Sequence, residues 1–293
     1  MTPALKHVMD NFNLLKLTIT IQLQQDTQLP AFKGSMLHGW FGHALKAADE
    51  HAYFICYGEH DNQQPKPYVI CPSDDHKTQW RKGELYRFEL SLFGQATQLV
   101  DSLFIALKIG ESLGFGPQRT PFQVISIATQ SPYGLQAGAV PSTLTQMIPL
   151  TNMPPLIDSE RELAVTFLTP TRLKTQGKVH KTHIPDVHFL NQHILRRLVQ
   201  LTRFWVLDDP VLFDELYTYQ PAIRQVKTTN HCYFEDWQRF SHKSQEHLPF
   251  GGLKGQVSFY GDLTNLIPVL KIGELLHIGG KTTFGLGKYQ LIT

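Results

Sequence analysis

The chain has 293 residues, of which 42% are hydrophobic and 18% charged, and its formal net charge is +2 with its 14 histidines neutral. This length and composition allow two cores of ordinary size and exclude a disordered protein. The chain has neither an apolar run long enough to span a membrane nor a signal-peptide pattern, so we expect a cytosolic protein. Cys56, Cys71 and Cys232 match neither a disulfide framework nor a zinc module, which predicts reduced, partly buried thiols.

The first half of the chain predicts strands and helices in the order β-α-β-β-α-β. Its strands alternate apolar and polar residues or are rich in β-branched residues, and its helices carry apolar residues at helical spacing. This order is the ferredoxin-like unit. The strands are expected at Leu14–Leu23, Tyr68–Cys71, Tyr86–Phe93 and Phe122–Ala128, and the helices at Ser35–Glu50 and Gln95–Ile109.

Residues 138–160 contain four prolines and little periodicity, which indicates a linker or long loop. The second half then repeats the order of the first. We therefore expect an α+β protein of two tandem ferredoxin-like (RRM-like) domains, at 1–140 and 161–293, joined by a linker at 141–160. The second domain is expected to have strands at Leu163–Leu168, Cys232–Phe240, Gly255–Tyr260 and Phe284–Ile292, and helices at Asp186–Trp205 and Leu263–Leu276.

The most specific motif is the glycine-rich end of the chain. It runs from a Gly-Gly-X-X-Gly turn at 251–255, through Gly-Asp-Leu at 261–263, to the segment HIGGKTTFGLGKY at 277–289. This pattern resembles the signature of the CRISPR repeat-processing endoribonucleases of the RAMP superfamily. The segments at 29–45, 88–96, 110–119 and 167–174 also resemble the family, so the likeness spans roughly residues 14–291.

The resemblance implies two ferredoxin-like domains and cleavage of a CRISPR repeat RNA at one phosphodiester, without a metal or other cofactor. It implies precursor CRISPR RNA as the substrate. Subunits of an interference complex are implied as partners, and a homodimer is left open.

Cleavage without a metal uses the 2′-hydroxyl of the RNA itself, which a general base deprotonates. Histidine suits this task because its imidazole titrates near neutral pH. Relatives carry the catalytic histidine on or just after the first helix, where this chain has His38, His43 and His51. His38 and His43 lie about 140° apart around a helix axis and so do not share a face. We rank His43 first, His51 second and His38 third.

Several cations near these histidines are candidates for contacts with the scissile phosphate. Lys46 follows His43 by one turn, and Lys33 precedes the helix. For each lysine alone an ordinary surface charge is the favoured interpretation, and each histidine is equally well explained as a surface or capping residue.

The glycine-rich loop predicts a surface that follows phosphates, because glycine lets backbone N–H groups approach an anion. Phe284 is expected either to stack on a base or to pack into the core. A basic loop at 174–183 and the second-domain helix supply further cations that could grip a hairpin stem by its phosphates. The predicted RNA-binding residues, besides Lys33, are Lys174, Lys178, Lys181, Arg196, His277, Gly279, Gly280, Lys281, Thr282, Thr283, Phe284, Gly287 and Lys288.

Three other functions fit parts of the sequence. A non-catalytic RNA-binding subunit would keep the folds without a working histidine. A metallohydrolase would use the histidine content, but the chain has no HExxH motif and no dense cluster of Asp, Glu and His. A backbone subunit of an interference complex is disfavoured by the two-domain plan and the terminal loop.

Overall fold

The computed structural model describes residues 1–58, 64–73, 76–149, 161–219, 226–241 and 246–292. Within these residues the chain forms two compact units. One contains Met9–Met147 and Leu201–Asp208, and the other contains Met1–Val8, Ile148–Gln200 and Asp209–Thr293. Residues 150–160, which form much of the expected linker, lie outside the described residues.

The first unit is built on an antiparallel sheet in the order β3-β5-β1-β6-β7, with β8 pairing the start of β1. The order of the first four strands is that of a ferredoxin-like domain. The connection from β1 to β3 is helical, and β5 lies between these two strands in the sheet. The strands are β1 Asn13–Leu23, β3 Tyr68–Pro72, β5 Leu85–Phe93, β6 Phe122–Ser131, β7 Gly134–Ala137 and β8 Ser142–Thr143, and a separate pair joins β2 Thr27–Gln28 to β4 Gln79–Trp80.

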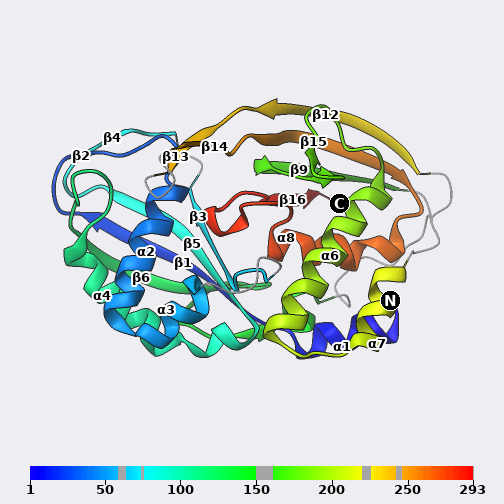
Figure 1. Cartoon of the computed structure of the whole chain (residues 1–293), viewed down its shortest axis with the longest axis horizontal. Helices are drawn as coiled ribbons and strands as arrows, with labels where there is room; N and C mark the ends of the chain where they lie inside the picture. The colour runs from blue at the N-terminus through cyan, green and yellow to red at the C-terminus, as the bar shows by residue number, and fades with distance from the viewer. Residues whose placement is uncertain (59–63, 74–75, 150–160, 220–225, 242–245, 293) are drawn as a thin grey trace. The chain divides into compact units, whose positions relative to one another are not determined.

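Three longer helices belong to this unit: α2 Gly34–Ala48, α3 Glu50–Tyr57 and α4 Val100–Leu113. They lie over one face of the sheet (Figure 1). The indole Nε1 of Trp40 on α2 donates to the backbone oxygen of Gly110 on α4 at 3.1 Å, and a Cβ at Gly110 would meet the indole at 2.6 Å. Glycine at this position therefore lets the two helices pack closely.

The second unit repeats the plan with an antiparallel sheet in the order β12-β15-β9-β16. Its helices α6 and α8 share one face, where Gly273 of α8 lies against both Ile194 of α6 and Tyr289 of β16. The main elements are β9 Arg161–Thr171, α6 Val187–Trp205, β12 Lys227–Glu235, β15 Gly252–Gly261, α8 Ile267–Leu276 and β16 Tyr289–Ile292. The prediction of an α+β fold with two ferredoxin-like domains is confirmed.

Smaller elements complete the two units. They are α1 Pro3–Asn11, η1 Gly94–Gln98, α5 Leu144–Met147, β10 Lys174–Thr175, β11 Lys178–Val179, α7 Pro210–Thr218, β13 Gln238–Ser241, β14 Glu246–Pro249, η3 Thr264–Leu266 and η4 Thr282–Phe284. None of the described helices is long and apolar enough to cross a membrane.

Three predicted elements differ from the structure. The strand predicted from Phe284 begins only at Tyr289, because a 3₁₀ turn and glycines with positive φ occupy the preceding residues. The strand predicted at Cys232–Phe240 is interrupted between β12 and β13. The helix predicted from Gln95 begins at Val100, after the 3₁₀ turn η1.

Replacing Phe41 by alanine tests how much the helix layer of the first unit stabilises it. Phe41 is 2% exposed, so the substitution should lower the free energy of unfolding by about 3–5 kcal/mol. Urea denaturation of the full chain, monitored by circular dichroism, measures the change. Phe54→Ala is the matched control on α3, because Phe54 is 57% exposed and should cost less than about 1 kcal/mol. Equal losses for the two variants would contradict the packing described here.

Candidate active site and nucleic-acid interface

The three candidate bases lie on two consecutive helices but in different surroundings. His43 on α2 is exposed, whereas the neighbouring Phe41 and Ala44 are buried in the core. Lys46 is also exposed and follows His43 by one turn, so the two side chains share a helix face. The Lys46 ammonium lies 5.5 Å from the centroid of the Tyr53 ring. An imidazole and a cation are therefore presented together at this surface.

His38 is half-buried and faces an aromatic cluster. Its ring lies edge-on to Tyr57 at 5.0 Å between centroids, and its backbone oxygen accepts a 2.7 Å hydrogen bond from the Tyr57 hydroxyl. Tyr57 in turn stacks on Tyr53 at 5.3 Å. These contacts favour a packing role for His38.

Asp49 separates α2 from α3 and places His51 at the start of the second helix. The backbone at Asp49 is extended, with φ −159° and ψ 111°, which ends the helix that the sequence pattern predicts as continuous to Glu50. Its Oδ1 accepts from the N–H groups of His51 at 2.9 Å and Ala52 at 3.2 Å, and its Oδ2 accepts from Ser102 Oγ at 2.6 Å. The hydrogen bond from Ser102 is the main cause of the lowered pKa of the Asp49 carboxyl.

The role of Asp49 as an N-cap is not among the features predicted from the sequence. Aspartate is a preferred N-cap residue. Its place directly before a new helical turn is the signal in the sequence for the start of a second helix. The cap leaves the His51 side chain exposed in the first turn of α3.

Lys33 differs from its expected place. Its side chain is fully buried, with its ammonium 5.6 Å from the Trp80 ring centroid and 5.8 Å from that of Tyr86. Nζ also donates to the Ala31 backbone oxygen at 3.4 Å. This structure does not present Lys33 to a phosphate, so the predicted contact with RNA receives no support.

The glycine-rich loop between α8 and β16 packs directly on the end of β9. A Cβ at Gly287 would lie 1.9 Å from the Ile278 backbone oxygen, and a Cβ at Gly279 would lie 2.6 Å from that of Arg172. Both glycines also have positive φ, at 78° and 82°. Glycine is therefore needed here for close packing as well as for conformation.

Several N–H groups of the loop donate within the protein. Gly280 donates to the Arg172 oxygen at 3.0 Å, Ile278 to the Gly287 oxygen at 3.0 Å, and Gly287 to the Pro170 oxygen at 3.2 Å. These three N–H groups are therefore not available to phosphates, contrary to the expectation for the backbone of this loop. Cations and hydroxyl groups remain as the means by which the loop can contact RNA.

Side chains of the loop divide into buried and accessible groups. His277 is 1% exposed, and its Nδ1 lies 3.1 Å from the Leu286 backbone oxygen. Thr282 and Phe284 are also buried, and the Phe284 ring packs on Phe250 at 5.0 Å, so the core alternative for Phe284 is the one observed. The RNA contacts predicted for His277 and Thr282 receive no support from these positions. The accessible or half-buried polar side chains are Lys281, Thr283 and Lys288.

Arg172, which the site predictions did not include, underlies this loop. Its guanidinium is buried and donates to the backbone oxygen of Gly251. Burial lowers the pKa of this guanidinium. Arg172 thus joins the two glycine-rich segments of the motif.

The basic segment after β9 forms a short hairpin of β10 and β11. Gln176 and Gly177 both have positive φ, which is the geometry of a two-residue hairpin turn. Lys174, Lys178 and Lys181 are exposed along it. The sequence predicts a basic loop at these residues, and the structure shows a short hairpin with the same exposed cations.

Histidines hold the base of the hairpin to α6. Nε2 of His193 lies 3.1 Å from the Lys174 backbone oxygen, and Nε2 of His180 lies 2.8 Å from Thr175 Oγ1. Both imidazoles pack on the Phe189 ring, at 4.3 Å and 4.6 Å. Burial is the main cause of the lowered pKa of His180, followed by the charges of His193 and His183.

The paired arginines of α6 have opposite placements. Arg196 is exposed, as its predicted RNA contact requires, whereas Arg197 is buried and desolvation lowers its pKa to about 10. Within the part of the chain that the structure describes, no three His, Cys, Asp or Glu side chains are grouped so that they could hold a metal ion.

The substitution Gly287→Ala tests the close packing of the loop. The added Cβ would collide with the Ile278 oxygen, so we expect a loss of about 3 kcal/mol or more in the free energy of unfolding, measured by urea denaturation. Gly177→Ala is the matched control, because its φ of 80° is similar but its Cβ would meet nothing within 4 Å. That variant should lose only the conformational term of about 1–2 kcal/mol. If both variants lose the same free energy of unfolding, the collision with the Ile278 oxygen does not contribute to the loss.

Two family models match parts of the chain. Residues 165–289 match the family model of CRISPR-associated endoribonuclease Cas6, and residues 12–50 and 56–147 match a model described as an N-terminal domain. No curated protein sequence matches the chain.

Among solved structures, a Cas6 product complex shares 16% identity and a TM-score of 0.57, over 95% of this chain and 99% of that one. Cas6 of Thermus thermophilus shares 15% identity with this chain and gives a TM-score of 0.56, over 96% of this chain and 99% of that one. A partial Cas6-RT-Cas1–Cas2 complex shares 14% identity and gives a TM-score of 0.60, over 96% of this chain but only 46% of that longer one.

At these identities the structural likeness establishes the shared fold. The family match covers β9 from Val165, the basic hairpin, α6 and the whole glycine-rich loop up to Tyr289. The resemblance to CRISPR repeat-processing endoribonucleases is therefore confirmed for residues 165–289, which match the Cas6 family model.

Proposed function

We propose that this protein cuts repeat RNA in precursor CRISPR transcripts at one phosphodiester, without a metal ion, and so releases guide RNAs. The match of residues 165–289 to the Cas6 family model supports the class of substrate. The observation that carries the proposed chemistry is the joint exposure of His43 and Lys46 on one face of α2, with His51 exposed at the start of α3.

In the proposed reaction the neutral imidazole of His43 removes the proton of the 2′-hydroxyl next to the scissile phosphate. The 2′-oxygen attacks the phosphorus in line, and the bond to the 5′-oxygen breaks. The leaving oxygen takes up a proton, so the products end in a 2′,3′-cyclic phosphate and a 5′-hydroxyl. The Lys46 ammonium stabilises the charge that grows on the phosphate oxygens.

The exposed cations of the second unit supply the grip on RNA in this proposal. Lys174, Lys178 and Lys181 of the hairpin and Arg196 of α6 bind stem phosphates. Duplex RNA is recognised mainly through its shape and its phosphates, so a projecting basic hairpin suits this task. Lys281, Thr283 and Lys288 of the glycine-rich loop add contacts that position the strand.

Partners other than RNA follow from the similar structures. One of them is described as a product complex and another as part of a Cas6-RT-Cas1–Cas2 complex. We extend both associations to this chain, so that it holds its RNA product and joins other CRISPR proteins.

His43→Ala tests the assignment of the general base. Loss of a general base lowers the rate about 10²–10⁴-fold, while repeat binding should stay within about twofold because the exposed imidazole adds little affinity. Single-turnover cleavage of repeat RNA in EDTA measures the rate, and analysis of the product ends identifies the chemistry. Repeat RNAs from CRISPR arrays adjoining the gene are the substrates.

His51→Ala and His38→Ala are the matched variants of this experiment. We expect a smaller loss for His51 and the smallest for His38, which packs on Tyr57. Unchanged cleavage in His43→Ala removes that residue from the role. Binding without cleavage by the unmodified protein favours the non-catalytic RNA-binding alternative, and cleavage that EDTA abolishes favours a metallohydrolase.

Replacing Lys174, Lys178 and Lys181 together by glutamine tests the hairpin. Each lost phosphate contact should reduce the slope of log K against log salt by about one, so we expect a decrease of about three. Fluorescence anisotropy with a labelled RNA hairpin at several salt concentrations measures it. The control replaces Lys6, Lys82 and Lys108, which are exposed outside the hairpin, by glutamine. It changes the net charge equally and should leave the salt slope unchanged. Equal slopes in the two triple variants would show that only overall charge matters.

A further inference from the structure

The sheet of the second unit carries helices on one face and a row of exposed polar and aromatic side chains on the other. Val257 and Phe259 of β15 are buried on the helix side. Because side chains alternate along a strand, Ser258 and Tyr260 point to the opposite face. This outer face is defined here by Glu162 of β9, Ser258 and Tyr260 of β15, and Lys227, Thr229, His231 and Tyr233 of β12.

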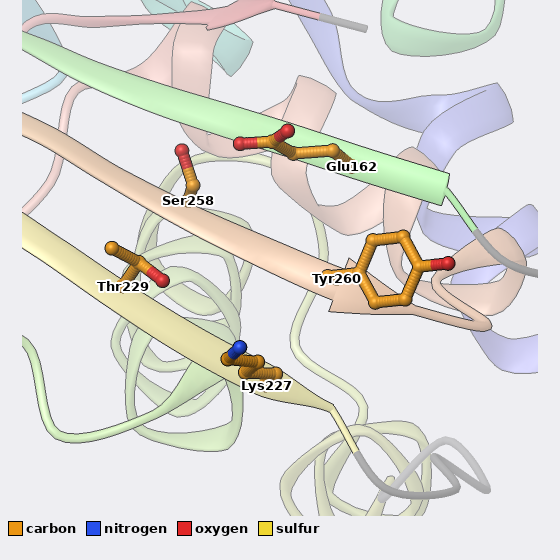
Figure 2. Close-up of a pocket in the computed structure, with 5 residues that line it drawn as sticks. All are labelled: Glu162, Lys227, Thr229, Ser258 and Tyr260. Carbon is orange, nitrogen blue, oxygen red and sulfur yellow. The ribbon is translucent and has the colours of Figure 1, made fainter.

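The outer face contains a hollow of about 370 Å³, lined by Glu162, Lys227, Thr229, Ser258 and Tyr260 (Figure 2). The strand register explains its shape. Lys227, Tyr260 and Glu162 are paired across three strands, and the next row on this face is Thr229, Ser258 and Ala164. The small side chain of Ser258 lies between larger neighbours in the lining of the hollow. A hollow of this size is within the range of small-ligand sites.

Exposed rings continue along β12 from this hollow. Tyr260 is 49% exposed and Tyr233 is 55% exposed. Tyr260 pairs with Lys227, and Tyr233 lies six residues further along β12, about 20 Å at 3.4 Å per residue. His231 is also exposed, and it lies between them. Three rings thus form a line across one open sheet face.

We propose that this outer face binds single-stranded RNA, with one base in the hollow against Tyr260 and further bases stacked on His231 and Tyr233. Base–aromatic stacking on an open sheet is how RRM-type domains hold unpaired nucleotides. Tyr260 lies here on the third strand of the βαββαβ order and Tyr233 on the second. The fit is to bases that are already unstacked, because a duplex hides the faces that rings contact.

The charges on the outer face set the direction of the bound strand. Glu162 is an acceptor only, so it suits the amino groups of a base and repels a phosphate. Lys227 lies on the far side of the hollow, on β12, and Lys254 of β15 pairs with Glu235 at 3.6 Å near Tyr233. The base in the hollow therefore points toward Glu162 of β9, and its phosphate lies on the side of Lys227. Hydroxyls of Thr229 and Ser258 are placed to read the edge of the base in the hollow.

This inference rests on the proposed function in one respect: the occupant is taken to be the unpaired part of the transcript beside the cleaved stem. The probe is a fluorescein-labelled decamer of 2′-O-methyladenosine, which has no 2′-hydroxyl to attack, and binding to the full chain is measured by anisotropy. Tyr260→Ala and Tyr233→Ala should each weaken binding about tenfold. Tyr260→Phe keeps the ring and should remain within about twofold of the unmodified protein. Lys227→Gln should reduce the salt slope by about 0.7.

Tyr133→Ala is the control, because Tyr133 is 81% exposed but lies in the turn after β6 of the other unit. The inference is overturned if both alanine variants bind the decamer within twofold of the unmodified protein, or if Tyr133→Ala weakens it equally. An equal loss of affinity for a ten-base-pair RNA duplex also overturns it, and circular dichroism melting confirms that each variant is folded. Repeat cleavage is measured separately: its absence, with the tyrosine effects intact, overturns the proposed function and leaves binding of single-stranded RNA standing.

Discussion

The contact between the glycine-rich loop and the end of β9 is the constraint on which the second unit depends. Gly287 lies so near the Ile278 oxygen, and Gly279 so near the Arg172 oxygen, that a side chain fits at neither position. This close approach brings the chain back into register, so that Tyr289 of β16 pairs with Phe167 of β9 and completes the sheet. The same contact turns His277 and Phe284 inward and leaves Lys281 accessible.

The loop therefore combines two roles that its sequence does not separate. Its glycines and several of its N–H groups serve packing, since their hydrogen bonds end on β9 and within the loop itself. Its cations Lys281 and Lys288 are accessible or half-buried. Buried Arg172 links the loop to Gly251, so the two glycine-rich segments of the family motif belong to one structural element.

Burial distinguishes residues of the same type that a sequence pattern treats alike. Lys33 lies among aromatic rings in the core, while Lys46 is exposed beside His43. Arg197 is buried and its neighbour Arg196 is exposed, because adjacent positions on a helix face about 100° apart. The match to the Cas6 family model covers residues 165–289, whereas the candidate bases lie outside it, on α2 and α3.

The sequence by itself determined the main order of the elements, the duplicated ferredoxin-like plan and the resemblance to CRISPR repeat-processing endoribonucleases. Alternation in strands, apolar spacing in helices and a long, specific glycine motif are local properties that survive without knowledge of contacts. Only the tertiary structure decided which candidates are accessible. It buried Lys33, His277 and Thr282, divided the first helix at Asp49, and ordered the basic segment into a hairpin. It also aligned Tyr260, His231 and Tyr233 on one sheet face, because strand register joins residues that are distant in the chain.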